Sequence, residues 1–206
     1  PQVATSFLAR CLASSGRELS VNKVVNEFKS RGVSTSRETL SNLLSYYEQA
    51  YLLFSLPDLS RSLADNTRAS SKVYAIDPGM FAAFTRASAQ ETGQRLETAV
   101  FNKLRRTTPP VRTGSLARLT FEHDNKSHEI DFVTGDTLLD DVYQLVQVSV
   151  NLDDPKTRAR ELSALADGMA KYGITESTMV TIDTEETVSV SSGIVHILPA
   201  WKWLLD

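Results

Sequence analysis

Apolar residues follow a helical spacing in the first fifty residues and a mixture of strand and helix spacings after them. This change is the feature that most limits which folds the chain can adopt. In residues 4–50, apolar side chains recur at three- and four-residue intervals, which predicts three amphipathic helices. The second of these helices is expected to stop at Gly32. Short apolar runs at 51–56 and 72–76 predict two strands on either side of a polar stretch.

Three helices followed by a two-stranded hairpin is the element order of a winged helix-turn-helix domain, expected here over residues 1–77. Such a domain lays its third helix in the major groove of DNA. Residues 1–72 hold nine basic and six acidic residues, a net +3, which fits a modest number of phosphate contacts. Many winged helices bind proteins instead, and charge alone leaves both interpretations open. The candidate DNA-binding residues on the helices and the wing are Lys23, Arg37, Asn42, Arg61 and Arg68.

Residues 78–206 alternate helical and strand patterns, which predicts an α/β domain. Residues 73–206 hold thirteen basic and nineteen acidic residues, a net −6. Helices are expected at about 90–106 and from Asp154-Pro155 to about Tyr172, where a carboxylate cap and a first-turn proline mark the start. The expected strands lie at 117–123, 127–134, 143–150, 178–183 and 194–198.

One of these strands carries two carboxylates. Alternation along it places Glu129, Asp131 and Val133 on one face, and Ile130 and Phe132 on the other. An acidic residue on a strand usually lies on a solvated face, so this pattern alone leaves a structural role open beside a catalytic one. A strand bulge would exchange the two faces.

The neighbouring helix and strand offer further polar side chains for a site. Glu97 lies on the helix, and Gln147 and Ser149 share a face of the strand that follows. If these side chains converge with Asp131, their oxygen atoms would suit Mg²⁺, which could generate a hydroxide nucleophile. The expected metal ligands are Asp131 and Glu97. One large nuclease superfamily has Glu-x-Lys where this chain has Gln-Val-Ser, and a serine cannot stabilise phosphate charge as a cation does.

Other chemistries find little support in the sequence. His123 and His128 flank a hairpin turn, where solvated side chains are expected rather than a zinc site. The chain lacks the GxxxxGK[ST] pattern of a P-loop ATPase. Its single cysteine, Cys11, permits no internal disulfide, and no apolar run is long enough to span a bilayer, so a cytoplasmic protein with no membrane partner is expected. The chain begins at Pro1 without an initiator methionine, which favours a piece of a longer protein.

Six stretches, in order, resemble a known prokaryotic family: LSNLLSYYEQAYLLFSLP, SKVYAIDPGM, GQRLETAVFNKLRR, HEIDFV, LVQVSV and RARELSAL. The chain is similar to the C-terminal region of ATP-binding proteins whose N-terminal half is an AAA-type ATPase. The resemblance implies a winged helix over residues 1–77 and, over 78–206, a domain of unknown function like the PD-(D/E)xK, or restriction-endonuclease-like, nucleases. It also implies an ATPase domain before Pro1, as the part that binds ATP and as a partner.

Carried over by resemblance, Glu97 corresponds to the helix glutamate of these nucleases and Asp131 to the strand aspartate. Gln147 and Ser149 fall on the Glu and Lys positions of the second strand, so the active site is expected to be degenerate.

The expected function is a C-terminal recognition or effector module of a prokaryotic ATPase, associated with nucleic acid. One alternative is a metal-dependent DNA endonuclease that uses Asp131, Glu97 and Gln147. Another is a protein–protein interaction module that regulates the ATPase. Two further family positions hold Arg160 and Glu161, for which a structural salt bridge is expected.

Overall fold

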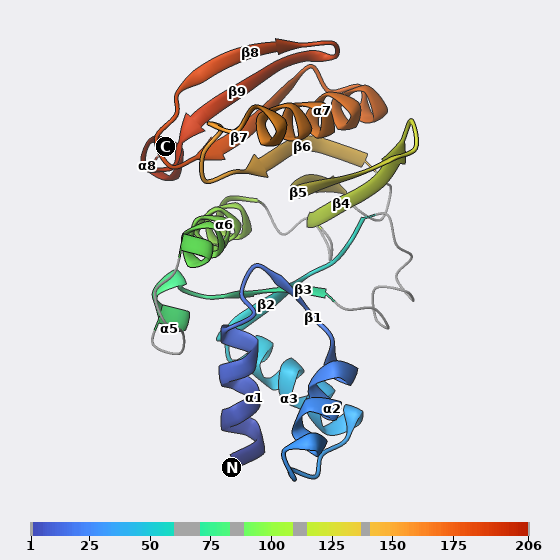
Figure 1. Cartoon of the computed structure of the whole chain (residues 1–206), viewed down its shortest axis with the longest axis vertical. Coiled ribbons are helices and arrows are strands. Elements are labelled where there is room, and N and C mark those ends of the chain that lie inside the picture. The colour runs from blue at the N-terminus through green and yellow to red at the C-terminus, as the bar shows by residue number, and fades with distance from the viewer. Residues whose placement is uncertain (1, 60–70, 83–88, 109–114, 137–140, 206) are drawn as a thin grey trace. The chain divides into compact units, whose positions relative to one another are not determined.

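The computed structural model describes residues 2–59, 71–82, 89–108, 115–136 and 141–205 (Figure 1). The chain divides into two compact units, each considered separately below. The first comprises Pro1–Leu56 and Leu63–Thr98, and the second comprises Pro57–Ser62 and Ala99–Asp206. The sequence suggested a boundary between residues 77 and 78, whereas this division falls inside helix α6 (Ala89–Thr107).

The first unit contains three longer helices and a small antiparallel sheet. The three predicted helices and both predicted strands are confirmed, and one short strand, β1, was not predicted. In the sheet, β3 lies between β1 and β2 and pairs antiparallel with both. The elements are α1 (Gln2–Leu12), β1 (Arg17–Leu19), α2 (Val21–Ser30), α3 (Arg37–Gln49), β2 (Leu53–Leu56), β3 (Ser71–Ala75), α5 (Pro78–Ala82) and the first half of α6.

One apolar cluster holds the helices of the first unit together. Phe7 of α1, Phe28 of α2 and Leu40 of α3 are fully or almost fully buried in it, together with Leu53 of β2. Each helix contributes one apolar stripe, as the three- and four-residue spacing in the sequence requires. The hydroxyl of Ser20 caps the start of α2 by accepting the backbone N–H of Lys23.

The second unit is a six-stranded mixed sheet, and α7 lies across one face of it (Figure 1). The strand order is β4-β5-β6-β7-β9-β8, in which β7 runs parallel to β6 and β9 while the other pairs are antiparallel. The predicted helices and strands are present, and the edge strand β8 was not predicted. The elements are the second half of α6, β4 (Leu116–His123), β5 (Lys126–Asp136), β6 (Asp141–Val148), α7 (Pro155–Tyr172), β7 (Glu176–Thr181), β8 (Glu186–Val190), β9 (Gly193–Pro199) and α8 (Ala200–Leu205).

Strand β5 carries a bulge at its acidic residue. Ala117 of β4 pairs with Val133, and Leu119 pairs with Ile130. Two steps along β4 therefore match three steps along β5, so β5 holds one extra residue around Asp131.

This bulge changes which side chains share a face. Alternation predicted Val133 beside Asp131, and Phe132 beside Ile130. Instead, Ile130 and Val133 both belong to the core that packs against α7. The ring of Phe132 packs against Phe101 of α6, with ring centroids 6.2 Å apart. The predicted faces are therefore wrong for Val133 and Phe132, because the extra residue reverses the alternation.

Candidate functional site

Asp131 and Gln147 join β5 and β6 through a reciprocal pair of hydrogen bonds. The backbone N–H of Asp131 donates to Oε1 of Gln147 at 3.1 Å, and the backbone N–H of Val148 donates to Oδ2 of Asp131 at 3.0 Å. Both side chains are buried, with 9% and 5% of their residues' surface exposed. These bonds follow the Phe132–Val146 pair, so side-chain atoms continue the strand pairing beyond it. Each side chain thus satisfies a backbone donor of the other strand.

Gln147 is in turn held by a charged pair on α7. Its Nε2 donates to Oε2 of Glu161 at 2.6 Å. The other oxygen of Glu161 accepts hydrogen bonds from Nε and Nη2 of Arg160, at 3.2 and 2.5 Å. The hydrogen bond and the charge of Glu161 raise the pKa of the Arg160 guanidinium above its ordinary value. The salt bridge expected between Arg160 and Glu161 is confirmed, and it joins the network around Asp131 through Gln147.

Ser149 takes part in the turn that leads to α7. It lies just beyond the end of β6, and its hydroxyl donates to the backbone carbonyl of Asn151 at 2.9 Å. The residue that replaces the nuclease lysine therefore has a local structural bond. A few residues later, the carboxylate of Asp154 accepts the backbone N–H groups of Lys156 and Thr157 and so caps α7.

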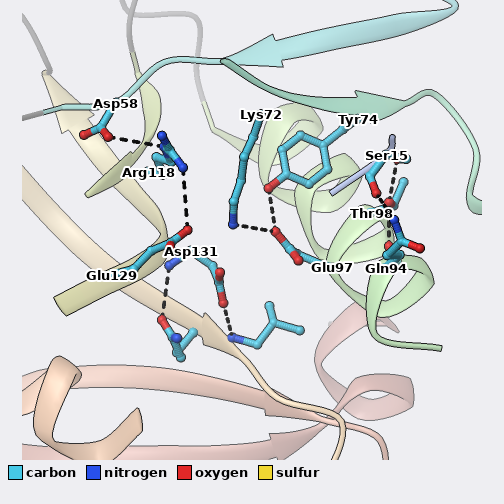
Figure 2. Close-up of polar contacts among 12 residues, drawn as sticks. Ser15, Asp58, Lys72, Tyr74, Gln94, Glu97, Thr98, Arg118, Glu129 and Asp131 are labelled. Carbon is cyan, nitrogen blue, oxygen red and sulfur yellow. Dashed lines mark hydrogen bonds and ion pairs between the residues drawn. The ribbon is translucent and has the colours of Figure 1, made fainter. Parts of the chain in front are cut away.

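Glu97 belongs to the first unit, where two side chains from β3 bind one of its oxygens (Figure 2). The Tyr74 hydroxyl donates to Oε1 at 2.7 Å, and the Lys72 ammonium lies 3.1 Å from the same atom. The side chains of Lys72 and Glu97 are only 11% and 17% exposed. A mostly buried, hydrogen-bonded ion pair therefore attaches the first half of α6 to β3. Glu97 and Asp131 lie in different units, so a site that combines them stays a prediction.

The magnesium site also stays a prediction. Within the described residues, no group of three or more His, Cys, Asp or Glu side chains is arranged to hold a metal ion. Of the predicted ligands in the second unit, Asp131 brings a charge, but one of its oxygens accepts the N–H of Val148. Gln147 brings a neutral oxygen that already accepts the N–H of Asp131. Mg²⁺ favours carboxylate oxygens in near-ideal octahedral geometry, and these contacts do not fit it well.

A buried ion pair that the sequence did not reveal binds the segment after β2 to strand β4 (Figure 2). Nε of Arg118 lies 3.3 Å from Oδ2 of Asp58, and both side chains are almost fully buried. The hydroxyl of Thr120 donates to the same carboxylate at 2.9 Å. Glu129, whose direction the sequence left open, lies with one oxygen 3.8 Å from Nη1 of Arg118. Asp58 and Arg118 are far apart in the sequence, so no periodic pattern predicts that they form an ion pair.

The predicted DNA-binding residues that the structure describes are exposed on α2 and α3. These are Lys23, Arg37 and Asn42. Glu27 pairs with both Arg10 and Arg31, and its single negative charge offsets one of these two positive charges. Among the described cations of the first unit, Arg17, Lys23, Lys29 and Arg37 have no ion-pair partner. The wing residues Arg61 and Arg68 lie outside the residues that the structure describes.

The histidine prediction is wrong for His128. This residue is 7% exposed, and its Nε2 lies 3.3 Å from Oδ2 of Asp167 on α7. Its ring stacks on Phe121, with centroids 5.3 Å apart. His123 is half exposed, as expected for a turn residue, and lies 3.8 Å from the other oxygen of Asp167. The two histidines therefore attach the hairpin to α7, because β5 turns His128 toward that helix.

Comparison with known proteins gives two matches. A family model described as a domain of unknown function (DUF8612) matches residues 1–91. The chain is also similar to the protein described as "Uncharacterized protein MJ1544" from Methanocaldococcus jannaschii, with 30% identity over 194 residues. That alignment covers 91% of this chain and 41% of the relative, so the chain spans about two fifths of the relative's length. No solved structure matches the chain at a significant level.

A helix that crosses a bilayer must be both long and apolar, and this applies to the helices that the structure describes. None of them is both long and apolar enough to cross a membrane.

Proposed function

We propose that this chain is a DNA-recognition module, in which a winged helix reads duplex DNA and a nuclease-like α/β unit binds without efficient cleavage. The observation that carries the proposal is the solvent face of α3. It presents hydrogen-bonding side chains in a row, and cations that have no ion-pair partner in the described part of the chain lie on α2 and at the start of α3.

The element order of the first unit supports the winged-helix part of the proposal. The order α1-β1-α2-α3-β2-β3, with β3 between the other two strands, is that of a helix-turn-helix followed by a hairpin. In such domains α3 is the helix that enters the major groove. Its exposed residues include donors and acceptors that suit base edges, and one acidic residue. These exposed residues are Glu38, Ser41, Asn42, Ser45, Tyr46 and Gln49.

The small number of available cations limits the strength of phosphate binding. Among the described residues of the first unit, Arg17, Lys23, Lys29 and Arg37 are exposed and have no ion-pair partner. Each phosphate neutralised on duplex DNA adds about 0.9 to the slope of log affinity against log salt concentration. Four such contacts would give a slope of roughly 3.6, well below that of strongly basic DNA-binding proteins. The module should therefore need partner domains or base contacts for tight binding.

The second unit supports recognition without cleavage. Its order of α6, an antiparallel β4-β5-β6 sheet, α7 and a strand parallel to β6 is compatible with a PD-(D/E)xK-like fold. The two positions that would carry charge, at the end of β6 and just beyond it, hold Gln147 and Ser149, and both side chains are engaged in internal hydrogen bonds. Cleavage would need a metal-bound nucleophile and a cation near the phosphate.

The wider role of the module is also part of the proposal. The family resemblance favours a position at the C-terminus of an AAA-type ATP-binding protein, with the ATPase domain as the partner. The archaeal relative is more than twice as long as the stretch that the chain matches, which leaves room in that protein for another domain.

Salt-dependent binding tests the recognition function. Anisotropy with a labelled random-sequence duplex should give an affinity that falls with salt, and Arg37→Ala should weaken binding and lower the slope by about 1. Lys126→Ala, an exposed lysine in the second unit, is the matched control. If the duplex does not bind, or if both variants behave alike, the first unit is not the DNA-binding part.

Metal titration separates recognition from the endonuclease alternative. Calorimetry with Mg²⁺ and Mn²⁺, run beside a nicking assay, should show neither metal binding nor cleavage for the wild type. Nicking that depends on metal and vanishes in Asp131→Ala would instead make the chain a nuclease and Gln147 a working ligand.

A further inference from the structure

Two helices of this chain end in the same way, with a glycine in the left-handed backbone region. After α2, Gly32 has φ +76°, and the next residue, Val33, donates its N–H to the carbonyl of Phe28. After α7, Gly173 has φ +67°, and Ile174 donates in the same way to Met169. This is the Schellman ending, in which the left-handed position is usually glycine because a Cβ atom is crowded there.

Helix α3 has the same ending, but a tyrosine occupies the left-handed position. Tyr51 has φ +57°, and its N–H donates to the carbonyl of Glu48 at 3.0 Å. The next residue, Leu52, donates to the carbonyl of Tyr47 at 2.9 Å. A bulky residue in this conformation is strained, whereas glycine at the equivalent places in α2 and α7 is not. Residues held in this region often have a functional reason for being there.

The ring of Tyr51 contributes little to the core of the unit. Tyr51 is 65% exposed, whereas the core contacts at this helix end are made by Tyr47 and Leu52. The ring meets Phe54 edge-on, with centroids 6.0 Å apart and an interplanar angle of 70°. Such a contact steadies the ring, and most of the surface of Tyr51 stays exposed to solvent. Tyr46, in the last turn of α3, is also 61% exposed.

The chemistry around these rings favours nucleic acid over an apolar protein partner. In the last two turns of α3, next to these rings, the exposed Asn42, Ser45 and Gln49 are polar and uncharged, and the carboxylate of Glu48 accepts the backbone N–H of Ser55. A protein hot spot is usually a desolvated pocket, whereas nucleobases stack on single exposed aromatic faces. The exposed cations Lys23 and Arg37 of the same unit complement a phosphate backbone.

We propose that Tyr51, assisted by Tyr46, stacks on an unpaired base where duplex DNA meets a single strand. This deepens the proposed function and rests on it: α3 holds the duplex, and the tyrosines select a junction or a frayed end. The preferred substrate class is then DNA with an overhang or a branch rather than blunt duplex.

The test compares one duplex in two forms, blunt and with a single-stranded overhang that carries 2-aminopurine at the first unpaired position. The wild type should bind the overhang form about tenfold more tightly, since stacking on one base has that order of effect, and should quench the 2-aminopurine. Tyr51→Gly should abolish this preference and the quenching while leaving binding to the blunt duplex. Tyr143→Gly, which removes an exposed tyrosine from β6 of the second unit, is the control.

Unfolding experiments distinguish this role from a structural one. Tyr51→Gly should unfold at a temperature equal to or above that of the wild type, because glycine relieves the strained φ. A protein that becomes at least as stable yet loses its preference for the overhang would support the stacking role. A lower unfolding temperature would overturn it, since Tyr51 would then be retained for stability.

The remaining outcomes separate this inference from the proposed function. Blunt binding that depends on Arg37, with no overhang preference in the wild type, would overturn the stacking role alone. Equal losses for both DNA forms in Tyr51→Gly would place the ring on the duplex and also overturn it. No binding of either form by the wild type would overturn both proposals and direct attention to a protein partner.

Discussion

At the scale of single residues, Gln147 owes its orientation to a neighbouring charge. Its amide oxygen accepts from Asp131 and its amide nitrogen donates to Glu161, so an amide fits here and a carboxylate does not. A glutamate at this position, which the nuclease pattern would require, could not donate to Glu161.

Gln147→Glu should therefore destabilise the second unit by about 2–4 kcal/mol at neutral pH, because the new carboxylate would lie against the buried carboxylate of Glu161. The loss should shrink as the pH falls and the pair takes up a shared proton. The double variant Gln147→Glu with Glu161→Gln exchanges the two groups and should regain most of the stability. Urea unfolding at several pH values measures this, and equal stability of the single variant and wild type would contradict the network.

Tyr51, unlike Gln147, has a side chain that conflicts with its local backbone conformation, a φ of +57°. Replacing it by glycine should raise the free energy of unfolding by about 0.5–1 kcal/mol. This is the strain energy relieved in the folded state minus the cost of the greater conformational entropy of glycine in the unfolded chain. The reverse change at the equivalent place, Gly32→Tyr, should destabilise by a similar amount. Chemical denaturation of the two variants checks both signs.

At the scale of elements, α7 depends on its first turn. Asp154 accepts bonds from the hydroxyl and backbone of Thr157 and from the backbone of Lys156, and these bonds lower its pKa from the ordinary value. A lowered pKa means that the cap stabilises the fold above the unfolded-state pKa and is lost as the pH falls through the folded one.

Asp154→Ala should accordingly lower the unfolding temperature at pH 7. The difference from wild type should vanish once the pH is low enough to protonate Asp154 in the folded protein. Scanning calorimetry between pH 7 and pH 2 follows this convergence, and a difference that is independent of pH would show that the carboxylate is not the cap.

The elements also show where sequence reasoning succeeds and where it stops. The helices could be predicted because each buries one stripe, as in α2, where Val24 and Phe28 are one turn apart and buried. Strand β1 has three residues and β8 has two half-buried valines, too little for a clear alternation. The bulge at Asp131 depends on pairing with β4, which a single strand's pattern does not contain. For the same reason, the sequence could suggest Asp131 and Gln147 as site residues but not their reciprocal bonds.

At the scale of the whole molecule, the two units have separate apolar cores, and each unit contains a different residue type whose reactivity or fluorescence reports unfolding. The single cysteine, Cys11, lies in the first unit, where burial raises its thiol pKa to about 12. Both tryptophans, Trp201 and Trp203, lie in the second.

Urea should therefore unfold the units at different midpoints. Cys11 should resist a thiol reagent in the native protein and react once the first unit opens, while tryptophan fluorescence reports the second unit. Two transitions separated by more than the fitting error are expected. A single coincident midpoint would mean that α6, which contributes to both units, makes the chain unfold as one cooperative body.

The short segment that holds Asp58 bears on how this protein can be divided. The backbone of Pro57–Leu59 pairs with Arg118 at the edge of β4, so residues that follow β2 in sequence complete the second unit's sheet and supply the acid for its buried arginine. No single cut in the polypeptide releases both units whole. A chain starting at residue 78 would lose Asp58, the nearer carboxylate of Arg118, and would keep Glu129 at 3.8 Å, so such a fragment should be less stable unless a peptide carrying Pro57–Leu59 is supplied with it.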